Sequence, residues 1–322
     1  MDDAPVSGDA AEAVSLADIQ SAAARLAGHA LRTPLLNSHA LDEIAGRRIW
    51  VKAECLQRTG SFKFRGAMNA VSRLPSGAGA VAVSSGNHAQ GVALAARLTG
   101  RQAVIVMPSD APSVKIEGTR ALGAEVIAYD RATEDRDALA AALAKDRGLF
   151  LLPPFDHPDV IAGQGTCGLE IAVDLPPEVS EVLVCCGGGG LTAGVALALE
   201  GRATVRPVEP EEFDDVGRSL AAGERVSNDR LSGSVCDAIL TSAPGRLTFP
   251  ILSRLCGPGL AVGDEEALRA VALAWRHLRV VLEPGGAVSL AAALRGGAED
   301  VGVVASGGNV DPKTFARALA ML

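Results

Sequence analysis

A lysine between two phenylalanines is the residue whose surroundings most favour chemistry in this chain. It lies in GSFKFRG, residues 60–66, and the whole chain has only seven Phe, two Trp and one Tyr. If residues 62–74 form a helix, Lys63 falls on an apolar stripe and Arg65 on a polar one. A lysine in an apolar environment has a lowered pKa, and its neutral amine is a usable nucleophile. The spacing alone does not exclude an ordinary exposed lysine at the start of a helix.

A second candidate is a loop of small polar residues that follows the apolar run at 80–83. Its members are Ser84, Ser85, Gly86, Asn87 and His88. At the start of a helix, such a turn presents backbone N–H groups, hydroxyls and one amide, which suit an anionic ligand. An ordinary capped helix has the same composition, so this loop by itself leaves both interpretations open.

A third loop contains four consecutive glycines after the apolar run at 182–184. Its residues are Gly187, Gly188, Gly189, Gly190 and Leu191. A glycine loop before a helix lets the backbone wrap around a phosphate group. The same loop matches G-x-G-x-x-A, ending at Ala193, and Glu209 follows at roughly the spacing of a dinucleotide site. A Rossmann-type NAD-dependent dehydrogenase is therefore an alternative, but it leaves the lysine segment and the SSGNH loop unexplained.

The elements that position these loops alternate between short apolar runs and helical patterns. The apolar runs lie at 80–83, 103–107, 125–129, 182–184 and 301–304, separated by Ala- and Leu-rich segments. Apolar strands without polar alternation, separated by helices, predict an α/β fold with mostly parallel sheets covered by helices. Ligands of such sheets bind at the carboxyl ends of the strands, where the candidate loops lie. Pro153-Pro154 is the best candidate for a crossing between two lobes.

Composition argues against several classes of protein. The net charge is −8 and no basic run occurs, so nucleic acid is not expected as a partner. Six cysteines without metal-finger spacing indicate reduced, buried thiols. The acidic N-terminus lacks the layout of an export signal, and glycines interrupt the uncharged run at 182–199. We therefore expect a cytoplasmic protein that does not enter the membrane.

Taken together and in order, these segments resemble a known enzyme family. SFKFRG at 61–66, SSGNHAQG at 84–91, the glycine quartet and SGGN at 306–309 are similar to segments of the fold-type II pyridoxal-phosphate enzymes. The resemblance, which covers about residues 30–315, is to the group of serine/threonine dehydratases, serine racemases and 3-hydroxyaspartate dehydratases.

The resemblance implies a two-lobe fold like that of the tryptophan synthase β chain. Residues 1–70 and 150–322 would form a large cofactor-binding domain, and residues 71–149 a small domain. The implied enzyme is an ammonia-lyase that converts a β-hydroxy α-amino acid, such as serine, threonine or 3-hydroxyaspartate, to a 2-oxo or imino acid. A serine racemase with side dehydratase activity is the nearest alternative. The partners implied are a small amino-acid substrate and a second copy of the chain in a homodimer.

The resemblance also implies roles for single residues. Lys63 would hold pyridoxal 5'-phosphate covalently and, once substrate displaces it, act as the base at Cα. Phe62 would pack beside the cofactor ring, Asn87 would bind its 3-oxygen, and Ser306 would face its pyridine nitrogen. The backbone from Gly187 to Leu191 would bind the phosphate.

For the substrate, the resemblance implies that the α-carboxylate binds the loop at 84–88, in which His88 would be structural. Ser85 could exchange a proton on the side of the cofactor opposite Lys63 and so permit racemisation, or it could be a silent small residue. Arg136 could receive a second carboxylate, as hydroxyaspartate requires, or be an ordinary surface arginine.

An acidic segment, VEPEEFDD at 208–215, is either a solvated loop or a cation site. In the family, the matching positions form a divalent-cation site from Glu209, the carbonyl group of Phe213 and Asp215, completed by water. Such oxygen ligands suit Mg²⁺ first, and also Ca²⁺ or Mn²⁺.

Overall fold

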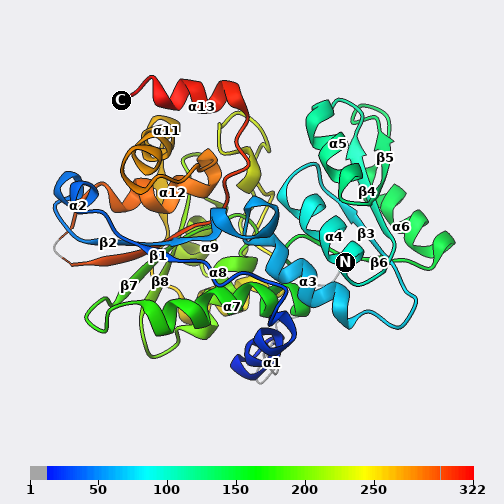
Figure 1. Ribbon diagram of the computed structural model, residues 1–322, viewed down its shortest axis with the longest axis horizontal. Coiled ribbons are helices and arrows are strands. Elements are labelled where there is room, and N and C mark those ends of the chain that lie inside the picture. The colour runs from blue at the N-terminus through cyan, green and yellow to red at the C-terminus, as the bar shows by residue number, and fades with distance from the viewer. Residues whose placement is uncertain (1–12, 298) are drawn as a thin grey trace.

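Two sheets, each covered by helices, form two lobes of unequal size (Figure 1). The structure is a computed structural model, and it describes residues 13–297 and 299–322. The strands are β1 (Leu35–Leu36), β2 (Ile49–Ala53), β3 (Ala80–Val83), β4 (Ala103–Pro108), β5 (Glu125–Tyr129), β6 (Phe150–Leu151), β7 (Glu181–Cys185), β8 (Thr204–Pro210), β9 (Leu260–Val262) and β10 (Val301–Ala305). The large sheet has the order β1-β2-β10-β7-β8-β9, and the small sheet has the order β5-β4-β3-β6.

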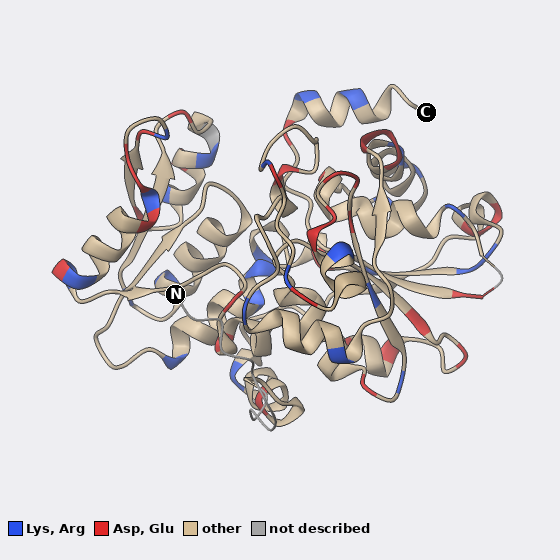
Figure 2. Cartoon of the chain, turned by 180° about the vertical axis from the view of Figure 1, so that it is seen from behind, with Lys and Arg blue, Asp and Glu red and all other residues tan. Residues whose placement is uncertain are grey.

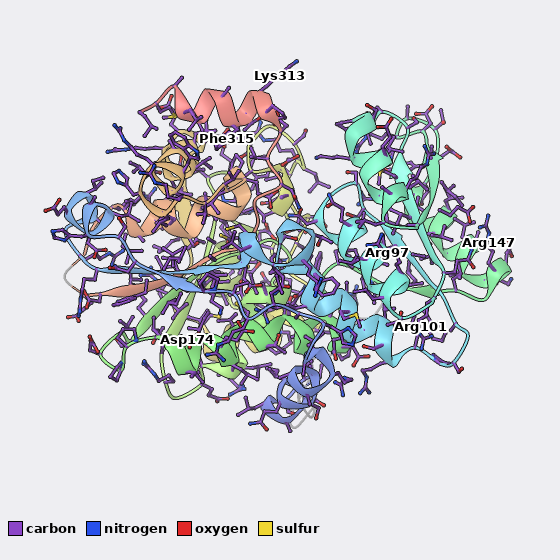
Figure 3. All side chains as sticks on the ribbon, viewed as in Figure 1. Arg97, Arg101, Arg147, Asp174, Lys313 and Phe315 are labelled. Atoms are coloured by element: carbon purple, nitrogen blue, oxygen red, sulfur yellow. The ribbon has the colours of Figure 1, made fainter. Side chains whose placement is uncertain are left out.

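Helices pack on these sheets and between the lobes. The small lobe contains α4 (Asn87–Leu98), α5 (Ser113–Ala121) and α6 (Arg136–Arg147), and α3 (Lys63–Arg73) lies between the lobes (Figure 1). The large lobe contains α1 (Leu16–Leu26), α2 (His39–Ala45), α7 (Pro158–Asp174), α8 (Gly190–Ala198), α9 (Asp215–Ala222), α10 (Thr248–Leu255), α11 (Asp264–Leu273), α12 (Pro284–Ala293) and α13 (Pro312–Leu319). Phe315, labelled in Figure 3, joins α13 to the core of this lobe.

Strand register explains why distant loops meet. Every strand pair is parallel except β1 with β2. In the large sheet, Val304 of β10 pairs with Val184 of β7, so both strands end at the same edge. In the small sheet, β3 lies between β4 and β6. The loops that follow β3, β6, β7 and β10 therefore lie at carboxyl ends of strands, where ligands bind in such folds.

The prediction of a two-lobe α/β fold with mostly parallel, helix-covered sheets is confirmed. The small sheet extends from residue 80 to residue 151, which is two positions beyond the small domain expected at 71–149. Positively charged residues (Lys and Arg) and negatively charged residues (Asp and Glu) are both scattered over the two lobes (Figure 2). The exact division of the chain into domains stays a prediction.

The uncharged run at 182–199 is a strand, a loop and a helix. It comprises most of β7, the glycine loop and α8, and most of it is buried. Within the described ranges, 13–297 and 299–322, no helix combines the length and the apolar character needed to cross a membrane. All six cysteines are free thiols; five of them are buried and Cys256 is partly exposed.

Candidate active site

A pocket of about 600 Å³ lies between the lobes, where the loops after β3, β6, β7 and β10 meet. It contains all the residues predicted to catalyse the reaction or to bind cofactor and substrate: Phe62, Lys63, Ser84, Ser85, Gly86, Asn87, His88, Arg136, Gly187, Gly188, Gly189, Gly190, Leu191 and Ser306. Segments far apart in the sequence thus face one cavity. The individual roles of these residues stay predictions.

Lys63 is the first residue of α3, and its amine is held in the pocket. Nζ donates a hydrogen bond of 2.8 Å to the carbonyl oxygen of Pro154 and lies 5.1 Å from the centre of the Phe62 ring. Burial lowers the pKa of Lys63 to about 8, although the carboxylate of Glu283 acts in the opposite direction. A much larger share of this amine is therefore neutral near physiological pH than for an exposed lysine.

Backbone hydrogen bonds attach the lysine loop to the loop that follows β10. Phe62 N donates to the carbonyl oxygen of Ser306 at 3.1 Å, and Gly308 N donates to that of Gly60 at 2.9 Å. Gly60 has a φ of +74°, and a Cβ there would lie 2.6 Å from Asn309 Oδ1, so glycine is strongly favoured at this position. This pairing fixes Lys63 and Ser306 in the same site.

Arg65 contacts polar groups, as expected from its place on the polar stripe of the helix, but its side chain is buried. Its side chain is 1% exposed and donates to Glu54 at 2.8 Å and to Glu170 at 2.7 Å. Lys52 also donates to Glu170, at 2.6 Å. The sequence did not predict this group of two cations and two carboxylates, because its members come from β2, a 3₁₀ turn (Glu54–Leu56), α3 and α7.

Two polar partners fix the amide group of Asn87. Asn309 Nδ2 donates to Asn87 Oδ1 at 2.8 Å, and Asn87 Nδ2 donates to Glu283 Oε1 at 2.6 Å. An amide nitrogen has two hydrogens, so one remains for a ligand in the pocket. Burial raises the pKa of Glu283 to about 7, against the effect of its hydrogen bond from Asn87.

Sequence reasoning missed Glu283 as a site residue. Its signal was weak, since it is an isolated carboxyl before Pro284 at the start of α12. Its place in the site depends on contact with Asn87, which is 196 positions away in the chain.

His88 is buried and bound to the backbone. Its Nε2 lies 2.9 Å from the carbonyl oxygen of Leu152, and the residue is 3% exposed. Burial, and then the nearby charge of Lys63, lowers the pKa of His88 to about 3. The ring is therefore neutral and donates to the carbonyl group, which fits the structural role expected for it.

Neighbouring atoms lie so close to the glycine loop that a Cβ at these positions would clash with them. A Cβ at Gly188 would lie 2.3 Å from the Phe155 ring, and a Cβ at Gly187 would lie 2.9 Å from the carbonyl oxygen of Ile239. Gly189 has a φ of +92°, a conformation that favours glycine. Because α8 begins at Gly190, its first backbone N–H groups lack partners within the helix and are suited to a phosphate.

The small lobe adds cations to the wall of the pocket, from Lys115, Arg131 and Arg136. Arg131 is bound to Asp110 at 2.8 Å, and Lys115 lies 3.9 Å from Asp237. Arg136 has a long contact of 3.9 Å with its neighbour Asp137. Sequence reasoning named only Arg136, since nothing in the pattern placed the other two at the same cavity.

The predicted cation site lies outside this pocket, at β8 and α9. Glu209 is fully buried and accepts backbone hydrogen bonds from Val216 at 3.0 Å and Gly217 at 2.7 Å. Asp215 accepts from Asn228 at 2.6 Å through Oδ1, whereas its buried Oδ2 has no hydrogen-bond partner among the described residues. Burial raises the pKa of both carboxyl groups, that of Asp215 to about 6.

A cation between these carboxylates would relieve the cost of burying them, so the site fits one. In the part of the chain that the structure describes, no group of three or more His, Cys, Asp and Glu side chains could hold a metal. The predicted site therefore depends on two carboxylates, the carbonyl group of the buried Phe213, and water.

Comparison with known proteins decides the family. The family model described as "Pyridoxal-phosphate dependent enzyme" matches residues 26–307. The chain belongs to this family. An L-threo-3-hydroxyaspartate ammonia-lyase from Pseudomonas sp is 43% identical over 314 residues, which cover 94% of this chain and 97% of that protein. A serine racemase from Schizosaccharomyces pombe is 38% identical over 314 residues, covering 94% and 96%.

A solved structure agrees with these relatives. The crystal structure of the T.th. threonine deaminase has a TM-score of 0.87 at 44% identity, and covers 92% of this chain and 99% of that one. The family and fold expected from the sequence are thereby confirmed, and with them pyridoxal phosphate as cofactor and a lyase as the enzyme class. The dehydrogenase alternative, based on the glycine loop alone, is not supported.

Proposed function

We propose that this chain is a pyridoxal-phosphate-dependent ammonia-lyase of β-hydroxy α-amino acids, and that it prefers 3-hydroxyaspartate. The observation that carries the proposal is Lys63, whose amine has a pKa lowered to about 8 and lies in one pocket with the glycine loop and Ser306. The test is direct: purified protein should be yellow, borohydride should fix the cofactor on Lys63, and a 2-oxo acid and ammonia should form from substrate.

The reaction removes a proton from Cα and a hydroxide from Cβ, and these two together make up the water that is released. Lys63, as a neutral amine shielded from solvent, takes the Cα proton. The bound cofactor withdraws electrons from Cα and so makes this proton easier to remove. Hydrolysis of the remaining enamine gives the 2-oxo acid and ammonia.

The residues that would hold the cofactor are the ones expected from the sequence. The backbone from Gly187 to Leu191 would bind its phosphate, Phe62 would pack beside its ring, and Asn87 would donate to its 3-oxygen. Ser306 offers a hydroxyl group, not a carboxylate, to the ring nitrogen. With a hydroxyl group as its partner, that nitrogen would stay largely neutral, which would favour quick loss of the β-hydroxyl group.

The substrate's α-carboxylate binds the loop from Ser84 to His88 at the start of α4, where the first backbone N–H groups of the helix have no partner within the helix. Arg136 receives a second carboxylate. Two observations support this: Arg136 lines the pocket and, among the described residues, has only a long contact to Asp137, and one relative is named for 3-hydroxyaspartate.

This preference can be tested with R136Q and a matched control. We expect kcat/KM for 3-hydroxyaspartate to fall at least tenfold, because a charge-assisted contact is lost, while that for serine changes little. Arg147, labelled in Figure 3, also lies on α6 but pairs with Glu125, so R147Q is the control. Equal losses for both substrates would contradict a role in recognising the second carboxylate.

Serine racemisation is the second candidate function, and the observation that favours it is Ser85. This hydroxyl lines the same pocket as Lys63, and racemisation needs a second group that can exchange the Cα proton. The S85A variant should lose racemisation while retaining elimination from one enantiomer. Chiral chromatography of the amino acid, run beside 2-oxo acid formation, separates the two activities.

We further propose a divalent cation, Mg²⁺ in the first place, at Glu209, the Phe213 carbonyl group and Asp215. The unpartnered Oδ2 of Asp215 supports it. Metal analysis of the purified protein, with D215N as the comparison, tests the site.

We also propose that the protein is a cytoplasmic homodimer. Its six free thiols fit a reducing compartment. Light scattering, which measures the mass in solution, tests the homodimer.

A further inference from the structure

A short segment at the crossing between the lobes joins the active-site lysine to the glycine loop. It runs from Pro154 to Asp156 and follows β6. The carbonyl oxygen of Pro154 accepts the hydrogen bond of Lys63, and the ring of Phe155 lies beside Gly188. Asp156 ends the segment, and its carboxylate faces the start of α10 instead of the pocket. The proposed reaction does not use this carboxylate.

The carboxylate of Asp156 binds the backbone at the start of α10. Its Oδ2 accepts from Arg246 N at 2.9 Å, and its Oδ1 accepts from Leu247 N at 2.8 Å and from Thr248 N at 3.3 Å. N–H groups at this end of a helix lack partners within it, and a negative charge is favoured there. Gly245 leaves room for this contact, since a Cβ there would overlap Asp156 Oδ1. Asp156 thus fixes the first turn of α10.

The first residue of α10 in turn holds the glycine loop. Thr248 is fully buried, and its hydroxyl group donates to the carbonyl oxygen of Gly188 at 2.7 Å. Gly245 N donates to the same oxygen at 3.1 Å. Neither Thr248 nor Gly245 lines the pocket, so this carbonyl group points into the large lobe, behind the glycine loop.

The peptide plane links that carbonyl group to the next N–H group. In a trans peptide the C=O and N–H bonds point in opposite directions. The described ranges contain no cis peptide bond, so the N–H group of Gly189 points away from Thr248, on the side of the pocket that Gly189 lines. Holding the carbonyl oxygen of Gly188 therefore also holds an N–H group that is expected to bind phosphate.

We propose that Asp156 and Thr248 are positioning residues that hold the N–H group of Gly189 in the orientation that binds the cofactor's phosphate. Asp156 fixes the start of α10, and Thr248 on this turn holds the carbonyl oxygen of Gly188. This inference rests on the proposed role of the glycine loop and deepens it. Loss of either side chain lets the peptide rotate, so the phosphate is bound more weakly while the amine of Lys63 stays in place.

The test compares two aldehydes that differ in the phosphate. Holoenzymes of the parent, T248V and D156N are dialysed against a series of concentrations of pyridoxal phosphate or of pyridoxal, which lacks the phosphate, and the bound aldehyde is read from its absorbance. We expect T248V and D156N to weaken binding of pyridoxal phosphate about two- to tenfold, the range for one lost hydrogen bond, and to leave pyridoxal binding unchanged. T248S, which keeps the hydroxyl group, should bind both aldehydes like the parent.

Two matched variants control for the loss of similar contacts elsewhere. T119V removes a buried hydroxyl group that donates to the carbonyl oxygen of Lys115 at 2.9 Å. D311N alters an aspartate that accepts from two backbone N–H groups at the start of α13. Neither Thr119 nor Asp311 lines the pocket, so both variants should bind both aldehydes like the parent.

A double variant tests the order of the contacts. In T248V, adding D156N should cause no further loss, because Asp156 acts through Thr248. Parent-like affinity of T248V for pyridoxal phosphate, an equal loss for pyridoxal, or a full additional loss in the double variant would overturn the proposal. If the parent binds pyridoxal as tightly as pyridoxal phosphate, the role proposed for the glycine loop is wrong, and this proposal falls with it. T248A provides the same measurement should T248V not fold, and 2-oxo acid formation by the parent tests the enzyme activity separately.

Discussion

Replacing Glu54 by Gln perturbs the buried charge group behind the active-site lysine. Glu54 is fully buried, and both of its carboxylate oxygens accept hydrogen bonds from Arg65 at 2.8 Å. Together with Lys52 and Glu170, these residues balance two positive charges against two negative charges. E54Q keeps the size of the side chain but leaves the two buried cations, Arg65 and Lys52, to share the single carboxylate of Glu170.

The cost follows from that unbalanced charge. Breaking a buried ion pair by removing one partner destabilises a protein by about 3–5 kcal/mol. At about 2–4 °C per kcal/mol, the melting midpoint should fall by roughly 6–20 °C. E54Q should also weaken cofactor binding, because Arg65 lies two residues after Lys63, the first residue of α3.

The dependence on pH gives a second signature. Burial alone would raise the pKa of Glu54, but the charge and hydrogen bonds of Arg65 hold it below its usual value. Such a group contributes stability that is fully present above the ordinary carboxyl pKa and is lost as pH falls through the lower folded value. The difference in melting midpoint between the parent and E54Q should therefore be constant near neutral pH and should become smaller in acid.

Thermal denaturation of the holoenzymes at one fixed cofactor concentration measures this effect. The control is E125Q, because Glu125 forms an exposed ion pair with Arg147 at 2.8 Å, and such pairs are worth about 0–1 kcal/mol. If E54Q melts within one or two degrees of E125Q, the buried charges are not held as described, and the reasoning fails.

Three further predictions concern the site itself. G188A should abolish cofactor binding, measured by absorbance, because its Cβ would lie 2.3 Å from the Phe155 ring. Cofactor capture by apoenzyme should quicken about tenfold per pH unit up to about pH 8 and then level off, because Lys63 reacts as the neutral amine and its pKa is about 8; a rate that keeps rising to pH 10 would contradict that lowered pKa. Removing divalent cations with EDTA should lower the melting midpoint of the parent but not that of D215N, because the cation offsets the burial of Asp215.

Much of the fold was predictable because it depends on local patterns. Apolar runs without alternation indicated the parallel strands, and the Ala- and Leu-rich segments between them indicated helices, such as α6 (Arg136–Arg147). The short strand β6 was not predicted, because two residues carry no periodic signal. The small sheet therefore extends further along the chain than the expected small domain.

The site was predictable where the local shape of a loop requires one type of residue. A run of four glycines costs too much chain entropy to be an ordinary turn, and the close contacts with Phe155 and Ile239 give the physical reason for it. Glu283, Asp156 and Thr248 were not assigned roles, because their environment depends on partners that only the folded chain brings near. Single residues of this kind carry no spacing signal that reasoning from one sequence can use.

The structure treats two cations of one helix turn in opposite ways, and this is how the segment GSFKFRG works. Arg65 is surrounded by carboxylates, so its pKa is raised although burial opposes its charge. Lys63 has a carbonyl group as its hydrogen-bond partner, and burial lowers its pKa to about 8. The charge of Arg65 is thus neutralised within the large lobe and anchors α3, while Lys63 has no paired carboxylate in the described part of the chain. A reactive amine at a fixed position requires both the anchoring of α3 by Arg65 and the absence of a charged partner at Lys63. Without the anchor, the helix could shift and Lys63 would reach water.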